Sequence, residues 1–383
     1  MPRILIDGFF YQKPYGFGRH VVEFCRALGT TGTDLDIVVA VPDRIDPASL
    51  PQLQSVRWHS LADANFVLWE QIAIPRLAKQ LHADAIHFPA NTRALRPGGI
   101  PTVTTVHDLL FLDEHRSMLR PKDFIASKYT KTVFRRGSSR PGHSARNAVV
   151  AVSETTRRAL AARGVEAVTI FNTADGFVSS YQGTVKPVGE RLAQSRRILH
   201  RGGHAEHRNT ARVLAAFAAV RSIVGTDITM DVVGTPDGEA VWGVGEAQGV
   251  RFLPRISDQA MAKTYAEASC VIATSLTEGF CLPIVEGFGF GTPVITSNVD
   301  PMNEIAGGAA ATVNPADEAA IATAVAHILS DPAVATRWAI KGYERAKAFS
   351  AQIVGAQAVA LYNQVLGRRV GDPREETQPV RRM

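Results

Sequence analysis

The chain has 383 residues, of which 45% are hydrophobic and 20% are charged, and its formal net charge is +6. This composition is that of a folded globular protein, and it excludes a disordered or fibrous chain. No apolar run reaches the roughly 20 residues that a helix needs to span a bilayer.

The length predicts two or three domains, because a single hydrophobic core seldom grows beyond about 250 to 300 residues. The first residues, Met1–Gly8, predict a strand and a loop and lack the small-residue cleavage site of a signal peptide. Three cysteines, Cys25, Cys270 and Cys281, have no CxxC spacing. Such an odd, scattered set is typical of buried thiols in a reducing compartment. We therefore expect a cytoplasmic protein.

Short β-branched runs alternate with longer amphipathic stretches in the first half of the chain. This alternation predicts a parallel sheet that helices cover on both faces. The expected strands are Ile4–Ile6, Ile37–Val41, Ala85–Phe88, Val103–Val106 and Val149–Val152, and the expected helices include Arg19–Leu28 and Thr155–Arg163.

Two polar patterns in this half have a structural interpretation beside a functional one. Asp34-Leu35-Asp36 matches the D-x-D pattern that binds a metal-nucleotide complex in some enzymes, but its place before an early strand argues against that role. Trp69-Glu70-Gln71 fits a segment that faces a substrate, and it fits a buried Trp at a helix start at least as well.

Basic residues concentrate in segment 116–146. This segment holds nine Lys or Arg and one acid, whereas the rest of the chain has 33 basic and 35 acidic residues. A solvated helix face explains such a run, and so does a docking surface for a phospholipid leaflet or a lipid-pyrophosphate acceptor. Nucleic acid is the least favoured partner because no recognised binding motif accompanies the charges.

A second strand–helix series follows a polar stretch, residues 175–195, that predicts an interdomain linker. The expected strands are Ile198–His200, Ile228–Val233, Val250–Leu253, Cys270–Ala273 and Pro293–Thr296, and the expected helices include Thr210–Val224, Asp258–Ala268 and Ala351–Leu366. We place the domains at 1–182 and 183–352, with a C-terminal helix and tail at 353–383 that pack back toward the first domain.

Both halves open with a strand, a glycine loop and a helix. The loops are Gly16-Phe17-Gly18-Arg19 and Gly202-Gly203, and neither forms a full G-x-G-x-x-G or a G-x-x-x-x-G-K-[ST] phosphate loop. Two facing, doubly wound domains would place both loops at one cleft between them.

The most informative stretch is Glu278–Glu286, with the sequence EGFCLPIVE. Gly279 lets the backbone approach a ligand closely, and Pro283 suits the first position of a helix. The amides of Phe280, Cys281 and Leu282 would then face an anion at a helix N-terminus, and a pyrophosphate is the natural occupant. Glu286, expected in the first helical turn, can accept hydrogen bonds from ribose hydroxyls.

This stretch, followed by Gly291-Thr292-Pro293-Val294, resembles the E-x7-E region of family 4 of the GT-B glycosyltransferases. Pro101–Asp108 is similar to that family's strand ending in His-Asp, and Ala151–Glu154 to its last N-domain strand and helix cap. The resemblance covers about residues 1–350. It implies the α/β GT-B fold, with two facing Rossmann-like domains.

The resemblance also implies a reaction and its site residues. It implies a retaining hexosyltransferase that needs no metal, with the acceptor in the N-terminal domain and a nucleotide-diphospho-sugar in the C-terminal one. The implied catalytic residues are Glu278 on the donor sugar, Arg208 on the diphosphate and His107 on the transferred sugar. The implied donor-binding residues are Gly18, Gly203, Arg208, Gly279, Phe280, Cys281, Leu282 and Glu286.

Two features depart from the family pattern. The family's Arg-Lys-Asn string is His207-Arg208-Asn209 here, so that Arg208 takes the lysine position, and Arg201 is a second candidate cation. The Asn-Gly turn near the domain junction is replaced by Asn172-Thr173. A catalytically silent sugar-nucleotide-binding module and an epimerase or hydrolase on the same fold remain alternatives. For the donor we favour GDP-mannose or a UDP-hexose, and for the acceptor a glycan or a lipid-linked saccharide at the inner membrane face.

Overall fold

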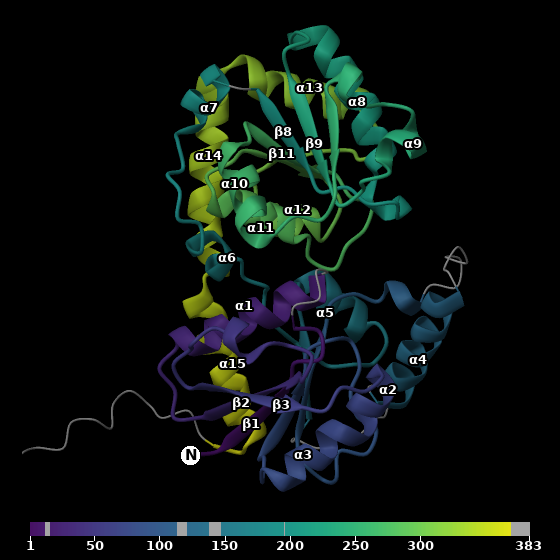
Figure 1. Ribbon diagram of the computed structural model, residues 1–383, viewed down its shortest axis with the longest axis vertical. Coiled ribbons are helices and arrows are strands. Elements are labelled where there is room, and N and C mark those ends of the chain that lie inside the picture. Colours follow the sequence, from purple (N-terminus) through teal and green to yellow (C-terminus); the bar gives the residue numbers. More distant parts are fainter. Residues whose placement is uncertain (12–15, 113–120, 138–146, 195, 369–383) are drawn as a thin grey trace, which may run out of the picture.

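The computed structural model describes residues 1–11, 16–112, 121–137, 147–194 and 196–368, and it has two α/β domains that face each other (Figure 1). Each domain contains one sheet whose strands are all parallel, which confirms the expected fold class. The apolar runs form these strands because helices bury both faces of each sheet.

The first sheet has the strand order β3-β2-β1-β4-β5-β6-β7. Its strands are β1 (Arg3–Asp7), β2 (Asp36–Pro42), β3 (Val56–Leu61), β4 (Ala85–Phe88), β5 (Thr102–Val106), β6 (Asn147–Ala151) and β7 (Val168–Thr169). Its helices are α1 (Gly16–Thr30), α2 (Phe66–Leu68), α3 (Ile74–Gln80), α4 (Pro121–Gly137) and α5 (Glu154–Ala161), with single turns η1 (Pro47–Ser49), η2 (Trp69–Ala73) and η3 (Leu110–Leu112).

The second sheet has the order β10-β9-β8-β11-β12-β13. Its strands are β8 (Arg197–His200), β9 (Thr229–Val233), β10 (Val250–Leu253), β11 (Cys270–Ala273), β12 (Val294–Ser297) and β13 (Ala311–Val313). The helices around it are α7 (Val188–Gln194), α8 (Thr210–Val224), α9 (Gly238–Trp242), α10 (Asp258–Glu267), α11 (Leu282–Gly289), α12 (Met302–Ala306), α13 (Glu318–Ser330) and α14 (Pro332–Ala346), with turns η4 (Glu206–Arg208), η5 (Glu246–Gln248) and η6 (Lys347–Phe349).

The stretch that the sequence predicts to be a linker contains two short helices, α6 (Asp175–Ser179) and α7. Phe177 of α6 is fully buried against the rings of Tyr265 and Phe290, and Val188 of α7 is buried in the core of the second domain. These apolar side chains, scattered among polar residues, explain why the segment is ordered although its composition predicts a loop.

The last described helix, α15 (Ala351–Val365), lies on the first domain (Figure 1). Val354, Ala358 and Leu361 are buried in the same cluster as Ile4 and Phe24. The hydroxyl of Tyr362 lies 2.7 Å from Nδ1 of His87 on β4. The chain therefore crosses between the domains twice, once before β8 and once after α14.

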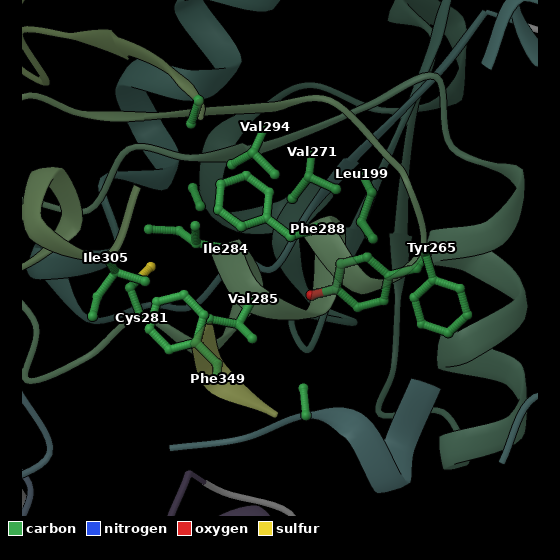
Figure 2. Packing of buried hydrophobic residues seen from close by; sticks show 14 of the residues in the cluster. Leu199, Tyr265, Val271, Cys281, Ile284, Val285, Phe288, Val294, Ile305 and Phe349 are labelled. Atoms are coloured by element: carbon green, nitrogen blue, oxygen red, sulfur yellow. The ribbon is translucent and has the colours of Figure 1, made fainter. Parts of the chain in front are cut away.

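The core beneath α11 holds that helix in place (Figure 2). Ile284, Val285 and Phe288 of α11 are buried against Val271 and Val294 of the sheet. Because the apolar face of α11 is fixed on β11 and β12, the N-terminus of the helix is held at the carboxyl end of the sheet. Among the described residues, no single helix is long and apolar enough to cross a membrane, although the bent pair Glu318–Ser330 and Pro332–Val365 meets that test by length and composition.

Candidate functional site

A cleft of about 850 Å³ lies between the two domains. The first domain contributes the start of α1 and the ends of β5 and β6, and the second contributes the loops that follow β8, β9, β10 and β11. Parallel sheets bind ligands beyond the carboxyl ends of their strands, and the volume is in the range of small-molecule sites. The cleft is therefore the candidate functional site.

The N-terminus of α11 opens into this cleft. Cys281 caps the helix in the left-handed backbone region, with φ of 71°, and Phe280, Cys281 and Leu282 all line the cleft. The helix begins at Leu282, so that Glu286 is its fifth residue and lies beyond the first turn. The expectation that Glu286 lies in the first turn is therefore wrong. The amides at this helix end are those that attract an anion.

Glu278 and Arg208 form an ion pair in the cleft. Nη1 of Arg208 lies 2.6 Å from Oε1 of Glu278, which also accepts a hydrogen bond of 3.0 Å from the Ser275 hydroxyl. Arg208 ends the turn η4, and its side chain is about one-third exposed. Gly203 also lines the cleft, and a Cβ there would crowd the Arg208 side chain, so the glycine leaves this arginine room.

Glu286 is completely buried and is not among the residues that line the cleft. Its Oε2 accepts hydrogen bonds from Arg201 at 2.8 Å and from the Tyr265 hydroxyl at 2.6 Å. Burial alone would raise the pKa of Glu286, but Arg201 and Arg19 outweigh it and hold the pKa below its ordinary value. Arg201, which the sequence offered as a second cation, lines the cleft where Glu286 was expected.

His107 lies at the end of β5 and lines the cleft, as Gly18 of α1 does, and its ring packs edge-on against the ring of Phe17. Its Nε2 lies 2.8 Å from the Pro89 carbonyl oxygen, which can only accept, so the hydrogen is on Nε2 and Nδ1 is an acceptor. Burial lowers the pKa of His107 to about 4, against the opposing effect of that hydrogen bond. At neutral pH the imidazole is therefore uncharged.

Gly279 brings the motif of the second domain onto the first domain. Its carbonyl oxygen accepts a hydrogen bond of 2.8 Å from the hydroxyl of Ser153, which follows β6. A Cβ built on Gly279 would overlap the backbone oxygen of His107. Only glycine permits this contact, which places the E-x7-E loop beside the His107 strand end.

Several residues of the site were not assigned by the sequence analysis. Tyr265 supports Glu286, Arg19 approaches it, and Asp258 pairs with Arg19. The glycine loop expected at Gly16–Arg19 is wrong, because these residues form the first turn of α1. Arg19 directly follows Gly18, which was assigned to the donor site, and that neighbour is a signal that sequence reasoning could have used. Tyr265 lies inside a predicted helix, and its sequence neighbours give no sign of its contact with Glu286.

The other polar patterns have structural partners. Asp34 pairs with Arg368, and Asp36 with Arg3 and Arg57, so that the D-x-D residues are engaged in ion pairs. All three cysteines are free and buried, as predicted. In the described part of the chain, no three His, Cys, Asp or Glu side chains gather closely enough to hold a metal ion.

Trp69 and Glu70 are buried in the first domain, which favours the structural interpretation of that segment. The Trp69 indole donates a 2.7 Å hydrogen bond to Asp7, and Glu70 accepts hydrogen bonds from the hydroxyls of Thr92 and Tyr129. Burial raises the pKa of Glu70 from 4.5 to about 7, although these hydrogen bonds oppose the shift.

We expect Glu70 to make stability depend on pH. Between about pH 4.5 and 7 the folded protein holds a proton on Glu70 that the unfolded chain releases, so the free energy of unfolding falls as the pH rises through this window. In the Glu70→Gln variant, which cannot titrate at this position, the fall in the free energy of unfolding should be smaller by up to about 3 kcal/mol. Urea unfolding at pH 5 and pH 8 measures the free energy of unfolding of the wild type and of the variant. If it changes between the two pH values by the same amount in both proteins, the prediction is contradicted.

The predicted basic segment lies partly outside the described residues, since 116–120 and 138–146 are not described. Within α4, Lys128, Arg135 and Arg136 are exposed. Exposed apolar side chains, Val67, Leu68 and Ile72, lie on the neighbouring turns α2 and η2, and the Gln71 amide donates a 2.8 Å hydrogen bond to the Tyr129 hydroxyl of α4. Basic and apolar side chains therefore lie on adjoining elements of the first domain.

Comparison with known proteins assigns both halves to related families. Residues 14–175 match the family described as "Glycosyltransferase Family 4", and residues 195–331 match that described as "Glycosyl transferases group 1". The chain is 30% identical over 170 residues to an MMP alpha-(1->4)-mannosyltransferase of Mycolicibacterium hassiacum, and 30% identical over 246 residues to a phosphatidyl-myo-inositol mannosyltransferase of Mycolicibacterium smegmatis. These alignments cover 42% and 62% of this chain, and 41% and 62% of the two relatives.

The fold has solved counterparts. The structure of Anabaena Alr3699/HepE in complex with UDP and glucose superposes with a TM-score of 0.66 at 18% identity, over 95% of this chain and all of that one. This likeness, together with the two facing parallel-sheet domains, identifies the fold as GT-B.

Proposed function

Since the chain belongs to glycosyltransferase family 4, we propose that it transfers a hexose from a nucleotide-diphospho-sugar to a saccharide or lipid-linked acceptor. The observation that carries the proposal is the meeting of Arg208, Glu278 and the α11 N-terminus at one cleft. A cation and unpaired helix-end amides attract a diphosphate, and a carboxylate beside them accepts hydrogen bonds from sugar hydroxyls.

The chemical task of such a site is to stabilise the leaving nucleoside diphosphate. When the bond between the anomeric carbon and the diphosphate breaks, negative charge grows on the phosphate oxygens and positive charge on the sugar. Arg208 and the amides of α11 are held in position before the reaction, and they stabilise the negative charge on the phosphate oxygens. The Nδ1 of the uncharged His107 serves as a hydrogen-bond acceptor for the sugar.

We propose that configuration at the anomeric carbon is retained through front-face transfer. Glu278 is tied to Arg208 and Ser275, which makes it a poor nucleophile for a covalent glycosyl intermediate. The leaving phosphate then accepts the proton of the acceptor hydroxyl. Arg208 and the α11 amides neutralise the diphosphate in this proposal, which assigns no role to a metal. A covalent glycosyl-enzyme, detected by mass spectrometry after reaction with a fluorinated donor, would contradict this mechanism.

We favour mannose as the transferred sugar, because the two relatives named above are mannosyltransferases by name. The donor proposed is GDP-mannose or a UDP-hexose. The test is a panel of UDP-, GDP-, ADP- and dTDP-sugars, each scored for a rise in Tm and for slow hydrolysis in the absence of acceptor. A donor that raises Tm and is also hydrolysed supports a transferase. A donor that raises Tm without turnover supports a silent binding module, and no response to any nucleotide would overturn the proposal.

Glu286→Ala is expected to weaken nucleotide binding by at least tenfold. The substitution removes the acceptor proposed for the ribose and also releases Arg201 from its place at the cleft. Isothermal titration with the nucleotide chosen by the panel measures the change in Kd. An unchanged Kd in a folded variant would remove Glu286 from the site.

We further propose that the first domain rests on an anionic phospholipid surface at the inner face of the membrane. Exposed Lys128, Arg135 and Arg136 lie on α4, and exposed Val67 and Leu68 lie on α2, whose Phe66 packs against Tyr129 of α4. Basic and apolar side chains on adjoining elements suit lipid headgroups and the upper acyl region. Cosedimentation with vesicles of 30% phosphatidylserine, compared with pure phosphatidylcholine vesicles, tests the proposal. Equal recovery on both vesicles would contradict it.

A further inference from the structure

One arginine of the first domain reaches two carboxylates of the second. Arg19, in the first turn of α1 and directly after Gly18, donates from Nη1 and Nη2 to Asp258 of α10 at 3.0 and 2.6 Å. Its Nε lies 3.9 Å from Oε1 of Glu286, and its guanidinium lies over the Phe177 ring, 4.1 Å from the centroid. The side chain is only 13% exposed, although it lines the cleft.

The oxygen that Arg19 approaches has an unmet hydrogen-bond requirement. Oε1 of Glu286 is buried and has no hydrogen-bond partner among the described residues, whereas Oε2 is satisfied by Arg201 and Tyr265. A buried acceptor without a donor destabilises the folded protein, because it has lost its hydrogen bonds to water. At 3.9 Å, Arg19 supplies charge but no hydrogen bond. The oxygen is shielded from the cleft in this structure, and a ligand hydroxyl that reaches it would supply the missing donor.

We propose that Arg19 is a positioning residue for the donor site and that it couples nucleotide binding to closure of the cleft. This inference rests on the proposed function. Because Arg19 belongs to the first domain and Glu286 to the second, separation of the domains would break their contact. Closure therefore stabilises the charged form of Glu286, which is the form proposed to accept ribose hydroxyls. By the reciprocity of linked equilibria, a bound nucleotide then favours closure by the same factor.

A second contact between the domains lies away from Glu286 and serves as a control for the Arg19 contact. Glu304 of α12 accepts hydrogen bonds from the amides of Glu154 and Thr155, at 2.7 and 2.8 Å, and so caps α5 of the first domain. Glu304 lines no part of the cleft and has no contact with Glu286 among the described residues. A variant at Glu304 therefore weakens closure alone, whereas a variant at Arg19 changes closure and the surroundings of Glu286 together.

The experiment is a double-mutant cycle read by nucleotide affinity. The Kd for GDP and for UDP is measured by calorimetry in Arg19→Ala, Glu304→Gln and Glu286→Gln, and in the two doubles that contain Glu286→Gln. We expect Arg19→Ala to weaken binding about tenfold, and Arg19→Ala with Glu286→Gln to be little weaker than Glu286→Gln alone. The factors by which Glu304→Gln and Glu286→Gln raise the Kd should multiply in the double variant, because these two residues act independently.

Three further measurements separate the possible failures. The radius of gyration from small-angle scattering, with and without nucleotide, should contract in the wild type and not in Arg19→Ala, and Arg19→Lys should recover part of the affinity by restoring the charge. Thermal unfolding verifies that each variant is folded. Independent effects of Arg19→Ala and Glu286→Gln would overturn the inference. Absence of nucleotide binding by the wild type would instead overturn the proposed function.

Discussion

Arg208→Ala is expected to lower kcat by about 10²- to 10³-fold, the usual effect of removing one preorganised charge from a developing anion. Arg208 lies at the cleft with its guanidinium 2.6 Å from Glu278, close to the α11 N-terminus. Its loss removes the cation proposed to stabilise the diphosphate and leaves Glu278 without its ion pair. Initial rates with the donor identified by the panel measure the effect.

Two controls separate charge from packing at this position. Arg208→Lys keeps the charge but loses the planar fork of donors, so its kcat should lie between those of the wild type and the alanine variant. Arg196 forms an ion pair with Asp227 away from the cleft, and Arg196→Ala should leave kcat unchanged. Turnover of Arg208→Ala equal to that of the wild type would remove Arg208 from the mechanism.

Gly279→Ala is expected to abolish measurable transfer while both domains stay folded. The added methyl group would overlap the backbone oxygen of His107, and a backbone atom cannot turn aside as a flexible side chain can. The least costly response is separation of the two domains at this contact, which breaks the Ser153–Gly279 hydrogen bond. Rates, together with the radius of gyration, should show a loss of at least 100-fold and a more open molecule.

The matched control is Gly189→Ala. Gly189 lies in α7, where a Cβ meets no atom within 4 Å, so alanine there should be neutral or slightly stabilising. An active, closed Gly279→Ala variant would show that this contact does not need glycine.

Sequence reasoning predicted the elements with strong internal patterns. β10, β11 and α8 have the predicted bounds. β11 is a continuous apolar run, β10 is an apolar run interrupted only by Arg251, and α8 is an apolar helix that ends before Gly225. The strands β3, β7 and β13 were missed. β3 and β7 are short or partly exposed, and the two residues of β7 carry no period that a pattern search can detect.

The site was predicted at the level of the motif and not at the level of contacts. The pair Arg208–Glu278 joins two residues that were assigned separately, and the structure places them together. Arg201 and Glu286 are 85 positions apart and meet because β8 and β11 are neighbours in the sheet. That adjacency depends on the strand order, which local patterns do not encode. Burial of Glu286 follows from it and was therefore not foreseen.

The return of α15 to the first domain makes that domain discontinuous in the gene. A fragment that ends near residue 182 encodes the first sheet without the helix that covers Ile4, Phe24 and their neighbours. It also lacks Tyr362, the partner of His87. A fragment that begins near residue 183 carries α15 with its apolar face exposed. A chimaera of two relatives should therefore take the first domain and the helix α15 from the same parent. A single crossover near residue 182 would separate them.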